Sequence, residues 1–350
     1  MAIGVSGTTV TIGAPANIIT ASCVVGSTTT YALTATTALV LYCSGASNYA
    51  LNAVVISVSG STCTVGSPAS CPSTCSAGGP AISTLLSATK GLVVVDNNTT
   101  TAFAHALTIS GTTVTWGAAL TVEAGITGWA TSNYTVYSGF SVTRYNPHLF
   151  PLSANTALLW YFDSNSVSRA VVLTESAGVV TAGAILYRSI SWAASGGTGA
   201  GAIFPQGATE FCSIKMFYGV SEGYGSYVTT NKISGASITV GASRSIGAPC
   251  GAPYYQNCTR LSTGKYVLHG SRGSADGASE LQVFNSNGDY VSLLGDISVP
   301  AMEGVLYAAG LITPIAVSSN RIALMGKVMT GTTVAVTTYQ LRLLNIEIAA

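Results

Sequence analysis

The stretch Leu107-Thr-Ile-Ser-Gly-Thr-Thr-Val-Thr-Trp-Gly117 decides the fold. It has two short runs rich in β-branched residues on either side of a Ser-Gly turn, which predicts a β-hairpin. Nearly the same phrase opens the chain at residues 3–13 and returns at residues 55–66. A hairpin that recurs along one chain indicates a repeat protein, because each repeat is one supersecondary unit.

Seven such hairpins are expected, each with a glycine at its turn. These glycines are Gly7, Gly60, Gly111, Gly178, Gly235, Gly288 and Gly331. Their spacings are 53, 51, 67, 57, 53 and 43 residues, about 54 on average. Ahead of six hairpins lies a compact apolar run of strand length, at 39–42, 92–95, 158–161, 214–217, 266–269 and 322–325. Each unit therefore has three or four antiparallel strands in about 50 residues.

Repeated units of this size predict an all-β chain that forms one β-propeller domain over residues 1–350, most simply with seven blades. One sheet cannot bury both faces alone, so the blades must pack face to face. The last β-rich run, at about 340–348, is expected to pair with the first hairpin at about 3–13. That pairing would close the ring and remove an exposed edge.

Other arrangements stay open. The 67-residue spacing leaves room for a degenerate unit, so six or eight blades are alternatives. A β-solenoid has shorter coils of about 20–30 residues, and a string of sandwiches would need linkers that the chain does not show. Four Gly/Ser/Ala/Tyr-rich segments, at 74–80, 127–148, 191–207 and 246–256, are expected to be loops on the faces of the blades.

Charge and hydropathy exclude several classes of protein. Charged residues make up 7% of the chain, the net charge is +1, and the charges are scattered without the basic stripe of a nucleic-acid-binding protein. No apolar run approaches the ~18 residues of a membrane-spanning helix. The first seven residues lack the charged and apolar regions of a signal peptide, so none is expected. A low-charge surface rich in Thr, Ser and Gly is common on the outside of particles and cells.

Cysteine is the main indicator of location. Candidate disulfides join Cys23 with Cys43, Cys63 with Cys71 or Cys75, and Cys250 with Cys258, while Cys212 is expected as a free buried thiol. Several disulfides imply an oxidising destination. A virion protein made in the host cytoplasm and oxidised after lysis would need no signal peptide. The alternatives are eight reduced cysteines that act as small hydrophobes, or a processed extracellular protein.

No motif for catalysis, metal binding or cofactor binding is found, so a non-enzymatic protein without cofactor is expected. The three histidines, His105, His148 and His269, fall in different units. The acidic residues are scattered, at positions such as Glu123, Asp163, Glu175, Glu210 and Glu303. A propeller glycosidase, which needs two facing carboxylates, is kept as a further hypothesis.

Aromatic residues gather in the predicted face loops, and Tyr with Gly and Ser is typical of adaptable recognition surfaces. The candidates for glycan or partner contact are Trp129, Tyr134, Tyr137, Trp192, Tyr224, Tyr254 and Tyr255. The alternative is that these side chains pack the loops onto the blades.

The hairpin phrase at residues 109–117, nearly repeated at 5–13, resembles repeats in structural proteins of tailed bacteriophages, including propeller-like head-fibre, decoration and tail-fibre proteins. The resemblance implies a protein on the virion exterior, and a homo-oligomeric or multi-copy state is expected. It would bind capsid, neck or tail proteins and stabilise the particle or mediate attachment. It carries over no catalytic residue. The alternative function is a lectin-like propeller that binds host-surface carbohydrate.

Overall fold

The computed structural model is all-β, and strands account for every regular element among the residues that it describes. The described ranges are 3–6, 9–12, 16–18, 29–44, 49–75, 81–96, 101–124, 133–136, 140–143, 148–162, 168–188, 201–205, 207–219, 223–245, 256–262, 264–271, 279–286, 291–299, 313–318, 321–330 and 338–347. The chain divides into two compact units, Met1–Ser189 and Ile190–Ala350, each described by itself below. A single domain over 1–350 stays a prediction.

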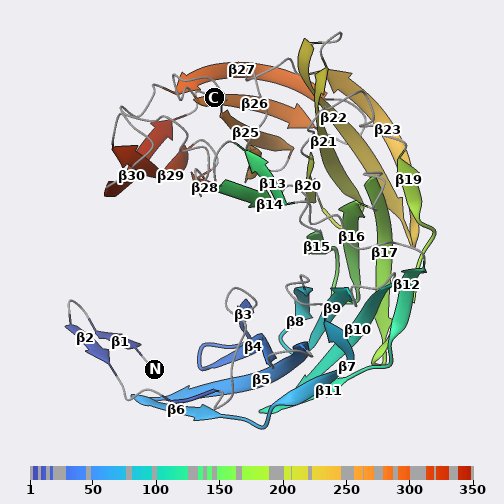
Figure 1. Cartoon of the computed structure of the whole chain (residues 1–350), viewed down its shortest axis with the longest axis vertical. Helices are drawn as coiled ribbons and strands as arrows, with labels where there is room; N and C mark the ends of the chain where they lie inside the picture. The colour runs from blue at the N-terminus through green and yellow to red at the C-terminus, as the bar shows by residue number, and fades with distance from the viewer. Residues whose placement is uncertain are drawn as a thin grey trace. The chain divides into compact units, whose positions relative to one another are not determined.

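The first unit contains three large antiparallel sheets, which we call the first, second and third sheet (Figure 1). The first sheet consists of β3 (Thr29–Ala32), β4 (Thr37–Ser44), β5 (Tyr49–Ser59), β6 (Thr62–Val65) and β7 (Ala69–Cys75). The second consists of β8 (Ile82–Ser87), β9 (Lys90–Asp96), β10 (Thr101–Ser110), β11 (Thr113–Trp116) and β12 (Leu120–Ala124). The third consists of β15 (His148–Pro151), β16 (Thr156–Phe162), β17 (Ser168–Ser176), β18 (Val179–Ala182) and β19 (Leu186–Arg188).

Two hairpins complete this unit, β1 (Ile3–Ser6) with β2 (Thr9–Ile12), and β13 (Asn133–Val136) with β14 (Phe140–Thr143). The second unit has three further antiparallel sheets. They are β20 (Gly201–Pro205), β21 (Glu210–Gly219), β22 (Gly223–Ser234) and β23 (Ser237–Ser245); then β24 (Gln256–Ser262), β25 (Lys265–Ser271), β26 (Ser279–Ser286) and β27 (Val291–Val299); and last β28 (Thr313–Ser318), β29 (Arg321–Thr330) and β30 (Thr338–Glu347).

All seven predicted hairpins are confirmed, because each predicted turn glycine falls between two strands that pair antiparallel. Gly60, Gly111 and Gly235 have φ of 58°, 59° and 58° at the first of two turn positions, the pattern of a type II′ turn. Ala177 and Gly178 both have positive φ, 51° and 82°, which is the pattern of a type I′ turn.

The outermost strand of each large sheet in the first unit is interrupted in the same way. Both β6 and β7 pair with β5, and the pairs β11/β12 and β18/β19 repeat this arrangement on β10 and β17. Each interruption begins at a glycine whose N–H donates to the long strand beside it, at 2.9 Å: Gly66 to Val55, Gly117 to Ala106 and Gly183 to Val172. The strand order is thus a four-stranded meander with a broken outer strand, repeated.

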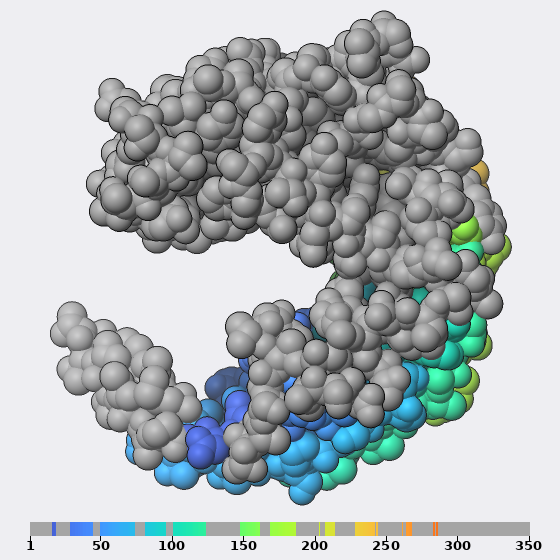
Figure 2. All heavy atoms as spheres, viewed as in Figure 1, coloured from blue at the N-terminus to red at the C-terminus, as the bar shows by residue number. Residues whose placement is uncertain are grey.

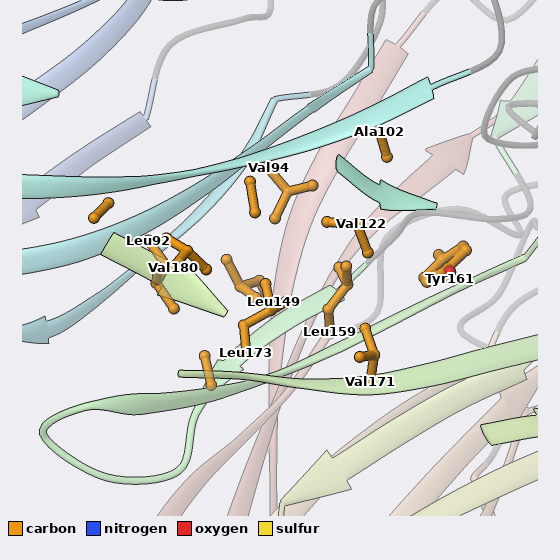
Figure 3. Close-up of a cluster of buried hydrophobic side chains, with 13 residues drawn as sticks. Leu92, Val94, Ala102, Val122, Leu149, Leu159, Tyr161, Val171, Leu173 and Val180 are labelled. Carbon is orange, nitrogen blue, oxygen red and sulfur yellow. The ribbon is translucent and has the colours of Figure 1, made fainter. Parts of the chain in front are cut away.

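The core lies between neighbouring sheets. In β9, Leu92 and Val94 contact the third sheet while Val93 and Val95 contact the first, and all four side chains are 0% exposed. Figure 3 shows the apolar layer between the second and third sheets, in which Leu92 and Val94 face residues of the third sheet. Sheets buried on both faces need continuous apolar runs instead of alternation, which explains why these runs are visible in the sequence.

Some expectations are wrong in detail. The apolar run 322–325 lies in β29, which is itself one arm of the last hairpin, and not ahead of that hairpin. Two of the predicted loops contain strands, namely the β13–β14 hairpin within 127–148 and β20 within 191–207. The β13–β14 hairpin lies within the 67-residue spacing between Gly111 and Gly178 and forms a two-stranded sheet.

The predicted pairing of the two chain ends is not formed in the described strand pairs. β30 pairs over its whole length with β29, and β1 and β2 pair with each other. Each of these strands is thus paired along one edge, by the strand next to it in the sequence.

Candidate functional site

The three sheets of the first unit have two distinct ends, and the strand register defines them. At one end, here called the turn end, lie the tight turns at Gly60, Gly111 and Gly178. At the other, here called the connection end, the chain passes from β4 to β5, from β9 to β10 and from β16 to β17. The strands β7, β12 and β19 also finish at the connection end.

A polar cluster bridges the second and third sheets at the connection end. Glu123 comes from β12, while Tyr161 and Arg169 lie opposite one another on β16 and β17. The Arg169 guanidinium donates to Glu123 Oε1, and the Tyr161 hydroxyl donates to Oε2. The side chains of Arg169 and Glu123 are 15% and 12% exposed, whereas Tyr161 is buried. We call these three residues the Glu123 cluster.

Tyr161 connects the Glu123 cluster to the core. In Figure 3 its ring lies at one end of the apolar layer, beside Leu159 and Val122. A buried phenol normally needs a hydrogen-bond partner, and the carboxylate of Glu123 supplies it. Through Tyr161 the core thus holds the carboxylate of Glu123, which in turn accepts from the Arg169 guanidinium.

A second ion pair joins the same two sheets at the turn end. Lys90 Nζ lies 2.7 Å from Glu175 Oε2, and the Gly178 N–H donates to Glu175 Oε1 at 2.8 Å. The Glu175 side chain is 1% exposed and that of Lys90 is 34% exposed. Burial alone would raise the pKa of Glu175, but the hydrogen bonds from Lys90 and Gly178 and the charge of Lys90 hold it below its usual value. This pair links the two sheets structurally.

The first and second sheets meet around His105, which is 0% exposed. Its Nδ1 lies 3.2 Å from the Gly117 carbonyl oxygen and its Nε2 lies 2.8 Å from Ser73 Oγ. Because a carbonyl only accepts, Nδ1 carries the proton, and Ser73 donates to Nε2. Burial lowers the pKa of His105, although the bond to Gly117 opposes this. The ring of Trp116 packs edge-on at 5.9 Å, and its Nε1 donates to the Ala69 carbonyl at 3.0 Å.

Asn52 provides a contrast with Arg169. It lies opposite Tyr42 in the first sheet as Arg169 lies opposite Tyr161 in the third. Its Nδ2 donates to Ser44 Oγ and to the Ala50 carbonyl at 2.8 and 2.9 Å, and Ser70 Oγ donates to its Oδ1 at 2.7 Å. This amide is buried and satisfied within its own sheet, so it serves the fold.

The aromatic candidates mostly fall where side chains are not described. Tyr134 lies on β13 and Tyr224 on β22. The other five lie outside the described residues: Trp129, Tyr137, Trp192, Tyr254 and Tyr255. Their role in binding stays a prediction.

The described cysteines are reduced. Cys63 and Cys71 are free thiols, and Cys43 and Cys212 are buried and reduced. Cys75 and Cys258 lie on β7 and β24 without described side chains, and Cys23 and Cys250 lie outside the described residues. The disulfide pairings and the alternative of eight reduced cysteines both stay predictions.

Two of the three histidines lie in the third sheet and the second unit. His148 stacks on Phe150 and Trp160, with ring centroids at 5.6 and 5.8 Å, and burial lowers its pKa. His269 is on β25. Across the described ranges, no group of three or more His, Cys, Asp or Glu side chains could hold a metal ion, and no helix is long and apolar enough to cross a membrane.

In the sequence, Glu123 and Glu175 stand out only as scattered acidic residues, and Arg169 and Lys90 were not predicted as site residues. A usable signal was present. With 7% charged residues, a charge placed in or beside an apolar strand is conspicuous, and a buried charge must be paired. What the sequence lacked was the face of the neighbouring sheet on which each partner lies.

No family model and no curated protein matches this chain. Solved structures with a similar arrangement include AofleA from Arthrobotrys oligospora, 10% identical, with 93% of this chain and 87% of that chain covered and a TM-score of 0.42. The SapL1 lectin, solved with α-methyl fucoside, is 12% identical with 89% and 92% covered and a TM-score of 0.41.

A third such structure is the β-propeller domain of the Trilobed protease from Pyrococcus furiosus, 6% identical, with 90% and 82% covered and a TM-score of 0.44. The architecture of this chain therefore rests on its own strand order, which is that of repeated antiparallel sheets of three to five strands in the described residues.

Proposed function

We propose that this chain is a non-enzymatic carbohydrate-binding protein and that the Glu123 cluster forms part of its binding site. The supporting observation is the partly exposed pair of Arg169 and Glu123 where two sheets meet. A guanidinium and a carboxylate side by side offer donors and acceptors together, which is what a hydroxyl-rich ligand requires.

The position of the cluster supports the same function. Glu123 is the penultimate residue of β12. In the sequence, the segment that follows contains Trp129 and leads to Tyr134 on β13. Binding sites commonly combine a rigid scaffold with residues from the adjoining connections. Sugar recognition needs aromatic faces as well as polar groups, and this segment carries the aromatic residues.

The test is a glycan array probed with the intact chain and with the Arg169→Ala variant. We expect binding to a defined set of glycans that Arg169→Ala reduces strongly. The matched control is Lys90→Ala, which breaks the other ion pair between the same two sheets and should leave glycan binding unchanged. An array without any bound glycan would contradict carbohydrate binding.

A second candidate function is a structural role on the exterior of a virion, which the hairpin phrase and the low charge favour. Attachment of a particle through a surface glycan would unite the two functions. Mass spectrometry of purified particles tests this proposal. We expect peptides of the chain at a fixed copy number relative to the major capsid protein, and their absence from the particles would contradict it.

A further inference from the structure

We infer that the ligand of the Glu123 cluster is a neutral sugar bound through two vicinal hydroxyls, and not a uronate, a sialate or a sulfated sugar. This inference rests on the proposed function and narrows its substrate class. It follows from the charge, the hydrogen-bonding character and the setting of the three side chains.

The net charge of the cluster disfavours an anionic ligand. Arg169 and Glu123 are in direct contact, so the pair is neutral as a whole. An anionic ligand that reached the guanidinium would bring its own negative charge next to the carboxylate of Glu123. Like charges at such distances disfavour binding, most of all where water is partly excluded. A neutral ligand does not meet this penalty.

The hydrogen-bonding character points to hydroxyl groups. Each carboxylate oxygen has two acceptor positions, and the described contacts place one donor on each, from Arg169 and from Tyr161. A guanidinium carries five N–H donors in a planar fork. A hydroxyl both donates and accepts, so one hydroxyl can donate to Glu123 while its neighbour accepts from Arg169. Vicinal hydroxyls match two adjacent groups of opposite character.

Tyr161 acts as a positioning residue. It is 1% exposed, and its hydroxyl holds Glu123 Oε2 from within the apolar layer. The carboxylate is therefore fixed between a buried phenol and the guanidinium. Ordering the site before binding lowers the entropic cost of binding.

The Glu123 cluster lies at the contact between the second and third sheets, and the corresponding positions of the other sheets carry different residues. In the second sheet the position that corresponds to Arg169 is Phe103, opposite Val95, and in the first sheet it is the satisfied Asn52. Within the described part of the first unit, the geometry thus assigns this site to the contact between the second and third sheets.

The test is calorimetry with the intact chain and three variants, Glu123→Gln, Arg169→Ala and Lys90→Ala. The probes are methyl glycosides of neutral hexoses and deoxyhexoses, set against glucuronate and N-acetylneuraminate. We expect neutral probes to bind the unmodified chain and Glu123→Gln to weaken them by about tenfold or more. Glu123→Gln should also improve binding of the acidic probes, because the charge of Arg169 is then uncompensated. Lys90→Ala should bind like the unmodified chain.

The outcomes separate the two proposals. Binding of acidic probes alone, lost in Arg169→Ala, would overturn the inference and leave carbohydrate binding intact. If neutral sugars bind and neither Glu123→Gln nor Arg169→Ala changes their affinity, the assigned site is overturned. The absence of any bound sugar would overturn the proposed function, and the inference with it. Thermal unfolding of each variant distinguishes a lost contact from a lost fold.

Discussion

An ideal Cβ at Gly117 would collide with the carbonyl oxygen of Gly178, so the break in the outer strand of the second sheet lies directly against the turn of the third. The preceding contact between sheets repeats this relationship. An ideal Cβ at Gly66 would lie 2.7 Å from the Thr112 carbonyl oxygen, in the turn of the second sheet. At both places the backbone of one sheet approaches the next too closely for a side chain.

Gly117→Ala and Gly66→Ala should each lower the free energy of unfolding by about 1–3 kcal/mol, because a methyl group would force two backbone segments apart. Denaturant unfolding measures the effect. The control is Gly207→Ala, since an ideal Cβ there meets nothing within 4 Å. We expect its stability to change by about 0.5 kcal/mol or less. Equal losses of stability in all three variants would show that the close approach of the two backbones is not the cause.

The repeat could be predicted because its signals are local. A turn glycine and the strands on either side are adjacent in sequence, so the Ser110-Gly111 turn between two β-rich runs already predicts the hairpin that the structure contains. The run 92–95 likewise reveals a strand buried on both faces. The pairing of the chain ends had no such local signal, and in the described strand pairs β30 pairs with β29, its neighbour in the sequence.

The candidate site could not be predicted for a related reason. Glu123 and Arg169 are 46 residues apart and Lys90 and Glu175 are 85 apart, on different sheets. Their contact depends on the order and register in which sheets stack. One sequence shows that each strand carries a charge, but not which charge it meets across the interface.

Lys90→Met should lower the free energy of unfolding by about 2–3 kcal/mol at pH 7, because it leaves the carboxylate of Glu175 buried without its cation. Adding Glu175→Gln to that variant should restore part of the loss, since an amide oxygen can still accept from the Gly178 N–H. Urea unfolding of both single variants and the double variant gives the coupling. Strictly additive effects would contradict a direct interaction between the two side chains.

The Lys90–Glu175 pair also predicts that the stability of the fold depends on pH in the acid range. Glu175 has a lower pKa in the folded protein than its usual value of 4.5. Its contribution to stability is therefore full above about pH 4.5 and is lost as the pH falls through the folded pKa. Between pH 5 and pH 3 the unmodified chain should lose more stability than Glu175→Gln does. Parallel curves for the two proteins would contradict the lowered pKa.

His105 should make the fold sensitive to mild acid. Its pKa is lowered by burial, so the unfolded chain takes up a proton near pH 6.5 before the folded chain does. Stability should then be full above that pH and decline below it, by up to about 1.4 kcal/mol per pH unit for one proton. Urea unfolding from pH 7.5 to 5.0 should show a shallower decline in His105→Gln. Part of the slope should remain, because burial also lowers the pKa of His148.

Cys63 and Cys71 should differ in reactivity. Burial raises the pKa of Cys71 to about 11, a bond from the Ser73 backbone opposes this, and the neighbouring Cys43 adds to it. At pH 8 about one thousandth of Cys71 is then thiolate, the form that reacts. Cys63 is partly exposed, so iodoacetamide should label it first in the folded chain, and Cys71 only after unfolding. Peptide mapping by mass spectrometry follows both sites. If Cys71 is instead found linked to Cys63 before labelling, the reduced state is wrong, and the disulfide that the spacing of the cysteines predicts is present.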